Sequence, residues 1–246
     1  MGHLVSLEEA RRDAVLAVLE GVGCTVDEFC SIGADPEIAA RVYAATLPLG
    51  MATDMQIART IRWYRLFSGL DMPVTPERII RVMPEREPGF DRLLFVAAGM
   101  RPNRGYESLQ RQCGPDTLWR SHDDLDAAIV SVRSTDEDYA VWVRDRPEAD
   151  EENQDRPATG FEQTDCETVE ERLIHEGLYF QQHGRHLDEV NVTLCAGSRS
   201  RGGSSVPGVG FGAANRRVGV CAGWCSVSDH RPHLRVRSVR RGKKAS

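Results

Sequence analysis

Four side chains that bind soft metals lie close together near the end of the chain, and they are Cys221, Cys225, His230 and His233. Zinc favours tetrahedral sets of cysteine and histidine, so this is the sharpest metal pattern in the sequence. In zinc sites of this type about a dozen residues separate the two ligand pairs. Only four residues separate Cys225 from His230. We therefore predict no metal and no cofactor, with a small zinc-binding module as an alternative.

A second group of metal-binding side chains lies near the end of a predicted helix. It consists of His175, Glu176, His183 and His186. Residues three apart share a helix face, so His183 and His186 have a spacing that suits a metal. The simpler explanation is that histidines at a helix C-terminus interact favourably with the helix dipole.

The short motifs that identify common enzyme classes are missing from the sequence. Neither a G-x-S-x-G nucleophile motif nor a phosphate-binding P-loop occurs. Three glycines, Gly208, Gly210 and Gly212, alternate with other residues, but they lack the spacing and the following helix of a dinucleotide fingerprint. The sequence therefore predicts no catalytic residues and a protein that is not an enzyme.

Apolar residues near the C-terminus follow a two-residue period, which predicts half-buried strands. Val218, Val220, Ala222 and Trp224 alternate with Arg217, Gly219, Cys221 and Gly223, and Leu234 and Val236 alternate with Arg235 and Arg237. Successive side chains of a strand point to opposite faces, so we expect the apolar set to be buried and the other set to face outward. This stretch should bury one side of a sheet and display the other.

The displayed side is the predicted ligand-binding surface. Its residues are small, polar or basic: Arg199, Ser200, Arg217, Gly219, Cys221, Gly223, Cys225, Ser226, Ser228, Asp229, His230 and His233. The predicted partner is a protein or another ligand whose identity the sequence does not contain. The oligomeric state is left open as well.

Length and composition predict a globular protein, because 246 residues with 41% hydrophobic and 28% charged side chains suffice for one large or two modest domains.

The net charge is distributed unevenly along the chain. Residues 191–246 hold eleven Arg or Lys and one acid, a sum of +10, so the net charge of −6 leaves −16 for residues 1–190. The basic tail Arg235–Lys244 makes a nucleic-acid-binding regulator an alternative, but the acidic remainder would repel a polyanion, and we expect no nucleic-acid partner.

The N-terminal residues show neither the basic region nor the apolar region of a secretory signal, and the longest apolar run, Leu93–Gly99, is too short to cross a bilayer. Seven cysteines, an odd number, favour reduced thiols over a disulfide framework. We therefore expect a cytoplasmic protein that does not contact a membrane.

Helix start and stop signals predict a mostly helical region over residues 1–133. Helices are expected to begin at Ser6, Thr25, Asp35, Thr53 or Asp54, Thr75 and Asp123. A buried helix is expected over Phe90–Met100, with a strand as the alternative. Tyr139–Arg144 alternates as a strand, and the acidic stretch 145–163 is the predicted linker. Thr168 and Glu171 form a capping box for a helix that ends at Gly184.

Four segments carry a resemblance to a known family: TLCAGSRS at 193–200, SVP at 205–207, RRVGVCAGW at 216–224 and LRVRSV at 234–239. Together they resemble the C-type-lectin-like domain of the variable proteins of diversity-generating retroelements, and similar endings occur in a large set of proteins from candidate bacterial phyla. In that family a helix precedes a strand, a polar loop, a V-P step and two closing strands. The resemblance implies an α+β protein in which residues 134–246 form a C-type-lectin-like domain with small antiparallel sheets.

The composition of the displayed stretch fits this resemblance. Retroelement mutagenesis of adenines in Asn codons does not produce Glu, Gln, Lys or Met, and residues 191–237 contain none of these four. Because lysine is rare in the whole chain, only the other three are informative. The resemblance therefore implies that the outward residues form a variable surface that binds a ligand.

Overall fold

The computed structural model describes residues 51–241, and it divides the chain into two compact units, Met1–Gln56 and Ile57–Ser246. Nearly all described residues belong to the second unit. The helices predicted to begin at Ser6, Thr25 and Asp35 lie outside the described residues, and so do Lys243 and Lys244 of the basic tail.

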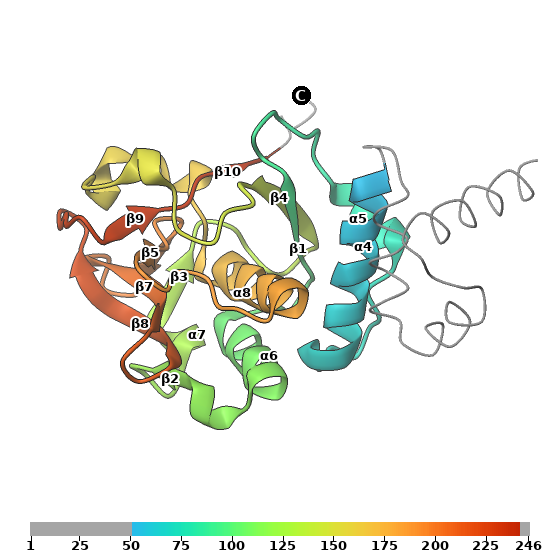
Figure 1. Ribbon diagram of the computed structural model, residues 1–246, viewed down its shortest axis with the longest axis horizontal. Helices are drawn as coiled ribbons and strands as arrows, with labels where there is room; N and C mark the ends of the chain where they lie inside the picture. Colours follow the sequence, from blue (N-terminus) through green and yellow to red (C-terminus); the bar gives the residue numbers. More distant parts are fainter. Residues whose placement is uncertain (1–50, 242–246) are drawn as a thin grey trace, which may run out of the picture. The chain divides into compact units, whose positions relative to one another are not determined.

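The second unit is an α+β structure with three sheets (Figure 1). The strands are β1 (Arg92–Val96), β2 (Leu118–Arg120), β3 (Ile129–Ser131), β4 (Tyr139–Val143), β5 (Val192–Leu194), β6 (Ser198–Ser200), β7 (Ser205–Gly212), β8 (Arg217–Ser226), β9 (Leu234–Val236) and β10 (Val239–Arg240). The orders are β1-β4-β10, β2-β8-β7-β5-β9 and β3-β6. Only the pairs β2–β8 and β5–β9 are parallel, so the five-stranded sheet is mixed and the other two are antiparallel.

Five helices precede or connect these strands over residues 51–241. They are α4 (Met51–Trp63), which continues as a π-helical turn over Tyr64–Ser68, α5 (Pro76–Val82), α6 (Pro102–Cys113), α7 (Leu125–Ala128) and α8 (Val169–His183). Single 3₁₀ turns occur at Pro115–Thr117, Glu151–Asn153, Ala158–Gly160 and Gln163–Asp165. Over residues 51–241, no helix has the length and apolar character needed to cross a membrane.

Helix α8 lies between the three-stranded and the five-stranded sheet (Figure 1). Its start is fixed by the predicted capping box: Thr168 accepts a hydrogen bond from the amide of Glu171, and the Glu171 carboxylate accepts one from the amide of Thr168. Gly184 ends the helix with φ 63°, a left-handed conformation that favours glycine. The helix predicted from Thr168 to Gly184 is confirmed.

Three apolar clusters form the core. The first packs α4, α5, β1 and β4 against Ile174 and Leu178 of α8. The second packs α6, β2, β7 and β8 against Val169 and Leu173 from the same helix. The third covers the β5–β9 end of the five-stranded sheet, where Leu194 and Val236 contact Ala158 of the acidic stretch. One helix therefore joins two of the cores.

Several predicted elements are confirmed and two are corrected. The strands over Tyr139–Arg144, Val218–Trp224 and Leu234–Val236 are present as β4, β8 and β9. The helix expected over Phe90–Met100 is wrong, because its centre is the buried strand β1; an apolar run this short has no period that separates the two forms. The helix expected over Asp123–Val132 stops at Ala128, where the chain turns into β3.

The domain boundary predicted at residue 133 does not separate compact units. Strands on the two sides of it pair with each other in all three sheets: β1 with β4, β2 with β8 and β3 with β6. The acidic stretch 145–163 is not a linker either. Asp150, Asn153 and Ala158 are buried, and the Asn153 amide donates to the carbonyl of Val236 at 2.9 Å.

The predicted alternation of β8 and β9 holds for most positions. Val218, Val220, Ala222, Leu234 and Val236 are buried, Arg217 and Gly223 are exposed, and Gly219 and Cys221 are half-buried. Arg237, expected to face outward, is buried instead. The side chain of Trp224 lies outside what the structure describes.

Candidate functional site

A row of neighbouring residues runs across strands β2, β8, β7 and β5 of the five-stranded sheet. The two residues in the middle of this row are glycines, which have no side chain. Trp119 of β2 lies opposite Gly219 of β8, and Gly219 lies opposite Gly210 of β7. On the far side of Gly210 comes Val192 of β5, whose Cγ2 atom would be 3.2 Å from a Cβ added to that glycine. The row therefore has an aromatic wall, a floor of bare backbone and an aliphatic wall.

This row forms a groove with a cavity volume of about 310 Å³, at the small end of the range for ligand sites. It is lined by Trp119, Val192, Gly210, Phe211, Gly212, Asn215, Arg217 and Gly219, and these residues are called the groove below. Trp119 is 45% exposed. An exposed indole beside a bare floor is suited to contact with an apolar or aromatic group of another molecule.

The end of the groove at Phe211 is held by α8 and by the loop after it. The Phe211 ring stacks on His186 at 4.4 Å between ring centroids, and His186 stacks on Phe180. His186 also bonds to Glu176, which is fully buried. The Phe211 amide donates to the carbonyl of Asp188 at 3.2 Å. Phe211 is thus fixed by both its ring and its backbone.

Asp188 and its partners form a buried ion network beneath this end of the groove. Its carboxylate accepts bonds from Arg172 at 2.9 and 3.1 Å and from Arg237 at 2.6 Å. Thr193 donates a fourth bond to it, and Arg172 also donates to Glu176 at 2.9 Å. The two guanidinium groups outweigh the cost of burial and keep the pKa of Asp188 below its usual value.

A second buried pair lies at the start of α8. Nδ1 of His175 is 2.8 Å from Oε1 of Glu167, and neither side chain reaches solvent. Burial raises the pKa of Glu167 to about 8 and lowers that of His175 well below its usual value. Oε2 of Glu167 and Nε2 of His175 have no hydrogen-bond partner within residues 51–241. The pair is electrically neutral near pH 7, which suits its burial.

One arginine, Arg217, lines the groove on the Trp119 side, whereas Arg120, the residue after Trp119 in β2, points to the opposite face of the sheet. Arg120 lies over the ring of Tyr106 at 4.9 Å, and Nε of Arg217 donates to the carbonyl of Asp116 at 2.9 Å. Within the described part of the chain, Arg217 has no ion-pair partner. The lining of the groove therefore carries one positive charge.

The structure does not bring the predicted binding residues into one site. Arg217 and Gly219 line the groove at the start of β8, whereas Ser226, Ser228, Asp229, His230 and His233 lie in or beside the turn after it. Six residues of β8 lie between Gly219 and Ser226, a separation of roughly 20 Å along an extended strand. Cys221 and Gly223 lie between the two ends, and Arg199 and Ser200 belong to β6 of another sheet.

One predicted binding residue is in the core. Cys225 is buried among Leu234 and Val236, because the strand register shifts opposite Pro207 and turns this side chain inward. The turn after it is closed by its own side chains: the Asp229 carboxylate accepts from the Ser226 amide, and the Ser226 and Ser228 hydroxyls bond to each other.

The burial of Cys225 is also relevant to the predicted zinc pattern, because this cysteine is one of its four residues. Cys225 lies in the third core, while His230 and His233 are exposed. In the described part of the chain, no three His, Cys, Asp or Glu residues are placed to hold a metal ion together. His175, His183 and His186 make other contacts: with Glu167, with the Tyr179 ring and with Glu176, respectively.

The basic tail contributes to the fold over the part that the structure describes. Arg235 donates to Gln154, Arg237 belongs to the buried ion network, and Arg240 pairs with Glu87 at 3.0 Å. These three arginines are therefore engaged within the chain.

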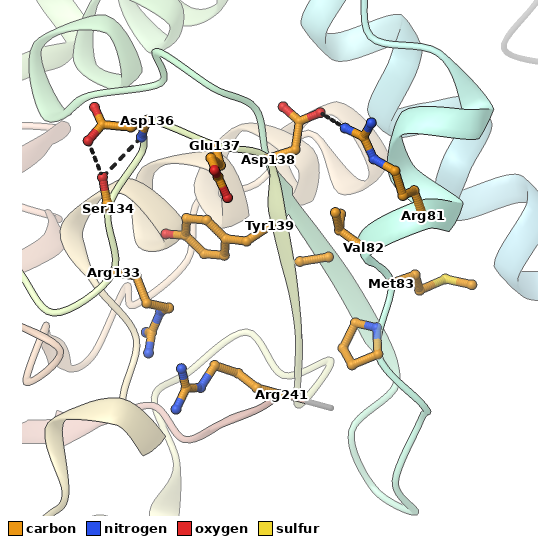
Figure 2. A pocket seen from close by; sticks show the side chains of 12 residues that line it. Arg81, Val82, Met83, Arg133, Ser134, Asp136, Glu137, Asp138, Tyr139 and Arg241 are labelled. Atoms are coloured by element: carbon orange, nitrogen blue, oxygen red, sulfur yellow. Dashed lines mark hydrogen bonds and ion pairs between the residues drawn. The ribbon is translucent and has the colours of Figure 1, made fainter. Parts of the chain in front are cut away.

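A larger pocket of about 630 Å³ lies between the segment after α5 and the loop before β4 (Figure 2). Its charged groups are mostly paired: Asp138 accepts from Arg78 and Arg81, and Arg133 binds the carboxylate of Glu171. The Arg78 hydrogen bond holds the pKa of Asp138 below its usual value. Most of the charges of this pocket are therefore paired within the fold.

Six groove residues were missed in the sequence: Trp119, Val192, Gly210, Phe211, Gly212 and Asn215. Trp119 falls in a region predicted to be helical, and its parallel pairing with β8 joins residues about 100 positions apart. The alternating glycines 208, 210 and 212 were the available signal, since glycines of period two in a strand leave one face without side chains.

The groove contains no Asp, Glu, His, Cys, Ser or Lys side chain. The groove therefore has no group for acid–base or nucleophilic chemistry, and its lining is suited to binding. No protein-family model matches the sequence, and neither a curated protein nor a solved structure matches the chain.

Proposed function

We propose that this chain is a binding protein without catalytic activity, and that the groove is where its ligand or protein partner is anchored. The observation that supports this most directly is the pairing of an exposed indole, Trp119, with the bare backbone of Gly219 and Gly210. Aromatic anchors in small pockets carry much of the energy of many interfaces.

We further propose that residues 134–246 belong to the C-type-lectin-like variable proteins of diversity-generating retroelements. The order of elements supports this reading: α8 precedes β5, a polar loop precedes the Val206-Pro207 step in β7, and β8 and β9 close the domain. The strands β1, β2 and β3 from the preceding residues complete its sheets.

The retroelement part is tested by the neighbouring DNA. A reverse-transcriptase gene together with a near-repeat of codons 191–239 is expected beside the gene. Differences between the repeat and the gene should fall at adenines and should include the codon of Arg217. A locus without the repeat would contradict this part and would leave the binding function of the groove to be judged separately.

The binding function is tested by capture from a lysate of the organism that makes the protein. The immobilised full chain is compared with two variants, Trp119→Ala combined with Arg217→Ala at the groove, and Ser226→Ala combined with His230→Ala at the distant turn. We expect the groove variant to lose the captured partner and the turn variant to retain it. Loss with the turn variant alone would place recognition at the other end of β8.

A further inference from the structure

We propose that the groove binds a small aromatic acid, a free molecule with one flat ring and one carboxylate. The inference rests on the proposed binding function and names the class of the ligand. Two features of the lining carry it: the narrow apolar slot over two glycines, and the hydrogen-bond donors at one end of that slot.

The middle of the groove is narrow and apolar. Gly219 and Gly210 form its floor, with Trp119 on one side and Val192 on the other. A Cβ atom added to Gly219 would lie 3.5 Å from Cε3 of Trp119, and one added to Gly210 would lie 3.2 Å from Cγ2 of Val192. Both walls therefore stand close to the floor, which suits a thin group. A ring beside the indole also gains an offset or edge-to-face contact in addition to its burial.

The polar side chains of the groove lie at one end, toward the turn between β7 and β8. Arg217 of β8 pairs with Gly212 of β7, two positions along each strand from the glycine floor. Two residues of extended strand span about 7 Å. Asn215 belongs to the turn, and its Oδ1 atom would lie 2.5 Å from a Cβ added to Gly212. A ring on the floor therefore has Arg217 and Asn215 beyond one of its edges.

This end of the groove offers hydrogen-bond donors. Nε of Arg217 donates to the Asp116 carbonyl at 2.9 Å, and its guanidinium has no carboxylate partner within residues 51–241. Oδ1 of Asn215, the acceptor atom of that side chain, already accepts a bond from the Arg217 amide at 3.2 Å. The terminal nitrogens of Arg217 and the amide nitrogen of Asn215 are donors. A charged donor beside a neutral one complements a carboxylate.

The charge and the size of the groove favour a small ligand with a single negative charge. Among the described residues that line the groove, Arg217 alone is charged, so the groove does not match the repeated charges of a nucleic acid. A sugar requires several polar lining groups, and apart from the Trp119 indole only Asn215 and Arg217 have polar side-chain atoms here. The volume of about 310 Å³ is at the lower limit for small-molecule sites, which agrees with one ring and a short acid chain.

The test follows the indole N–H signal of Trp119 in ¹H–¹⁵N NMR spectra of the full chain, with the Trp119→Phe variant to assign it. The probe is 3-phenylpropionate. Three analogues each change one property: 3-phenylpropionamide has no charge, 3-phenylpropylamine has a positive charge, and 3-cyclohexylpropionate has a saturated ring. The tripeptide Gly-Gly-Phe represents the C-terminus of a protein. The variants are Arg217→Gln and, as the matched change at an exposed arginine between β8 and β9, Arg231→Gln. Each variant is checked by thermal melting.

We expect 3-phenylpropionate to shift the Trp119 signal with a dissociation constant of about 0.1 to 1 mM, as suits a ligand of this size. The amide and the amine should bind at least about fivefold more weakly, because they lose the charged contact with Arg217. The cyclohexyl acid should bind at least about threefold more weakly. Arg217→Gln should lower the affinity for the acid to that for the amide, and Arg231→Gln should change neither affinity.

Equal binding of the acid and the amide, or of the phenyl and cyclohexyl acids, would overturn the inference. Tighter binding of Gly-Gly-Phe than of 3-phenylpropionate would overturn it in favour of a protein C-terminus. The capture from lysate tests the proposed function separately. If no probe shifts the Trp119 signal while the groove variant loses the captured partner, the inference alone fails. If no probe shifts the signal and the groove variant retains the partner, the inference and the proposed function both fail.

Discussion

Asp188 supports Phe211 from below: its carbonyl accepts the Phe211 amide at 3.2 Å, while its carboxylate binds the buried arginines Arg172 and Arg237. Its backbone has φ 56°, a left-handed conformation that Asp tolerates better than most residues. One residue therefore joins the ion network around α8 to Phe211, whose ring stacks on His186 and packs against the second core. The position of Phe211 therefore depends on the buried charges of Asp188, Arg172 and Arg237, which a ligand in the groove would not contact.

Replacing Asp188 with Asn should strongly destabilise the fold. The change leaves Arg172 and Arg237 buried with less than their full charge compensation, a situation that costs about 3 to 5 kcal/mol in other proteins. Urea unfolding measures the loss. The matched control is Glu189→Gln, which removes the exposed pair with Arg185 and should cost less than about 1 kcal/mol. Equal midpoints for the two variants would show that the network does not hold the fold.

Stability should fall as the pH rises from 6.5 to 8. Burial raises the pKa of Glu167 to about 8, so the folded state binds the Glu167 proton more tightly than the unfolded chain does. The stabilisation of the folded state that this proton provides decreases as the pH rises and is lost toward pH 8. His175 has a lowered pKa and affects stability only when the pH falls below about 6.5. One such proton gives roughly 1 kcal/mol per pH unit.

Glu167→Gln should flatten this slope, measured by urea unfolding at several pH values. Burial also raises the pKa of Glu170, to about 7, so part of the slope should persist. Glu162→Gln, at an exposed position, serves as the control and should retain the slope of the unmodified chain. If stability instead increases from pH 6.5 to 8, Glu167 is ionised in the folded state.

Leu234→Ala should destabilise the protein by about 2 to 5 kcal/mol, because it opens a cavity in the third core. Val190→Ala truncates an aliphatic side chain that is 78% exposed and should change stability by no more than about 0.5 kcal/mol. Chemical denaturation of the two variants measures both. A small effect for Leu234→Ala would contradict the packing of β9 against the acidic stretch.

Among the cysteines that the structure describes, Cys221 should react first with iodoacetamide. It is half-buried, whereas Cys195 and Cys225 are buried and burial raises the pKa of both thiols. Peptide mapping after brief labelling of the folded protein identifies the modified positions. Labelling of Cys225 before Cys221 would restore the predicted outward position of Cys225.

Local sequence signals predicted the elements whose structure is decided locally. The capping box of Thr168 and Glu171, the glycine at 184 and the alternation of Val218 and Val220 each specify a helix end or a strand face by themselves. These signals located α8 and β8 correctly. Long-range pairing was not predictable in this way, because residues 118–120 give no sign that their partner strand begins at Arg217.

The same distinction explains the errors at the site. Cys225 was assigned to the outer face by counting in twos from Val218, and the register shift opposite Pro207 breaks that count. Arg237 was assigned outward because it alternates with Leu234 and Val236, but Asp188 and Thr193 provide buried partners that only the fold brings near. Trp119 lines the groove because β2 pairs with β8, which sets it opposite Gly219, about 100 positions away in the sequence.

The most direct test of the groove is the dissociation constant of two glycine variants of β8 for the partner that the unmodified chain captures. Gly219→Val fills the floor, where an added Cβ already lies 3.5 Å from Cε3 of Trp119, while Gly223→Val adds the same side chain into open space on the same strand. We predict that Gly219→Val weakens binding at least about tenfold and that Gly223→Val leaves it unchanged. Unchanged binding by a folded Gly219→Val variant would contradict the assignment of the groove as the binding site.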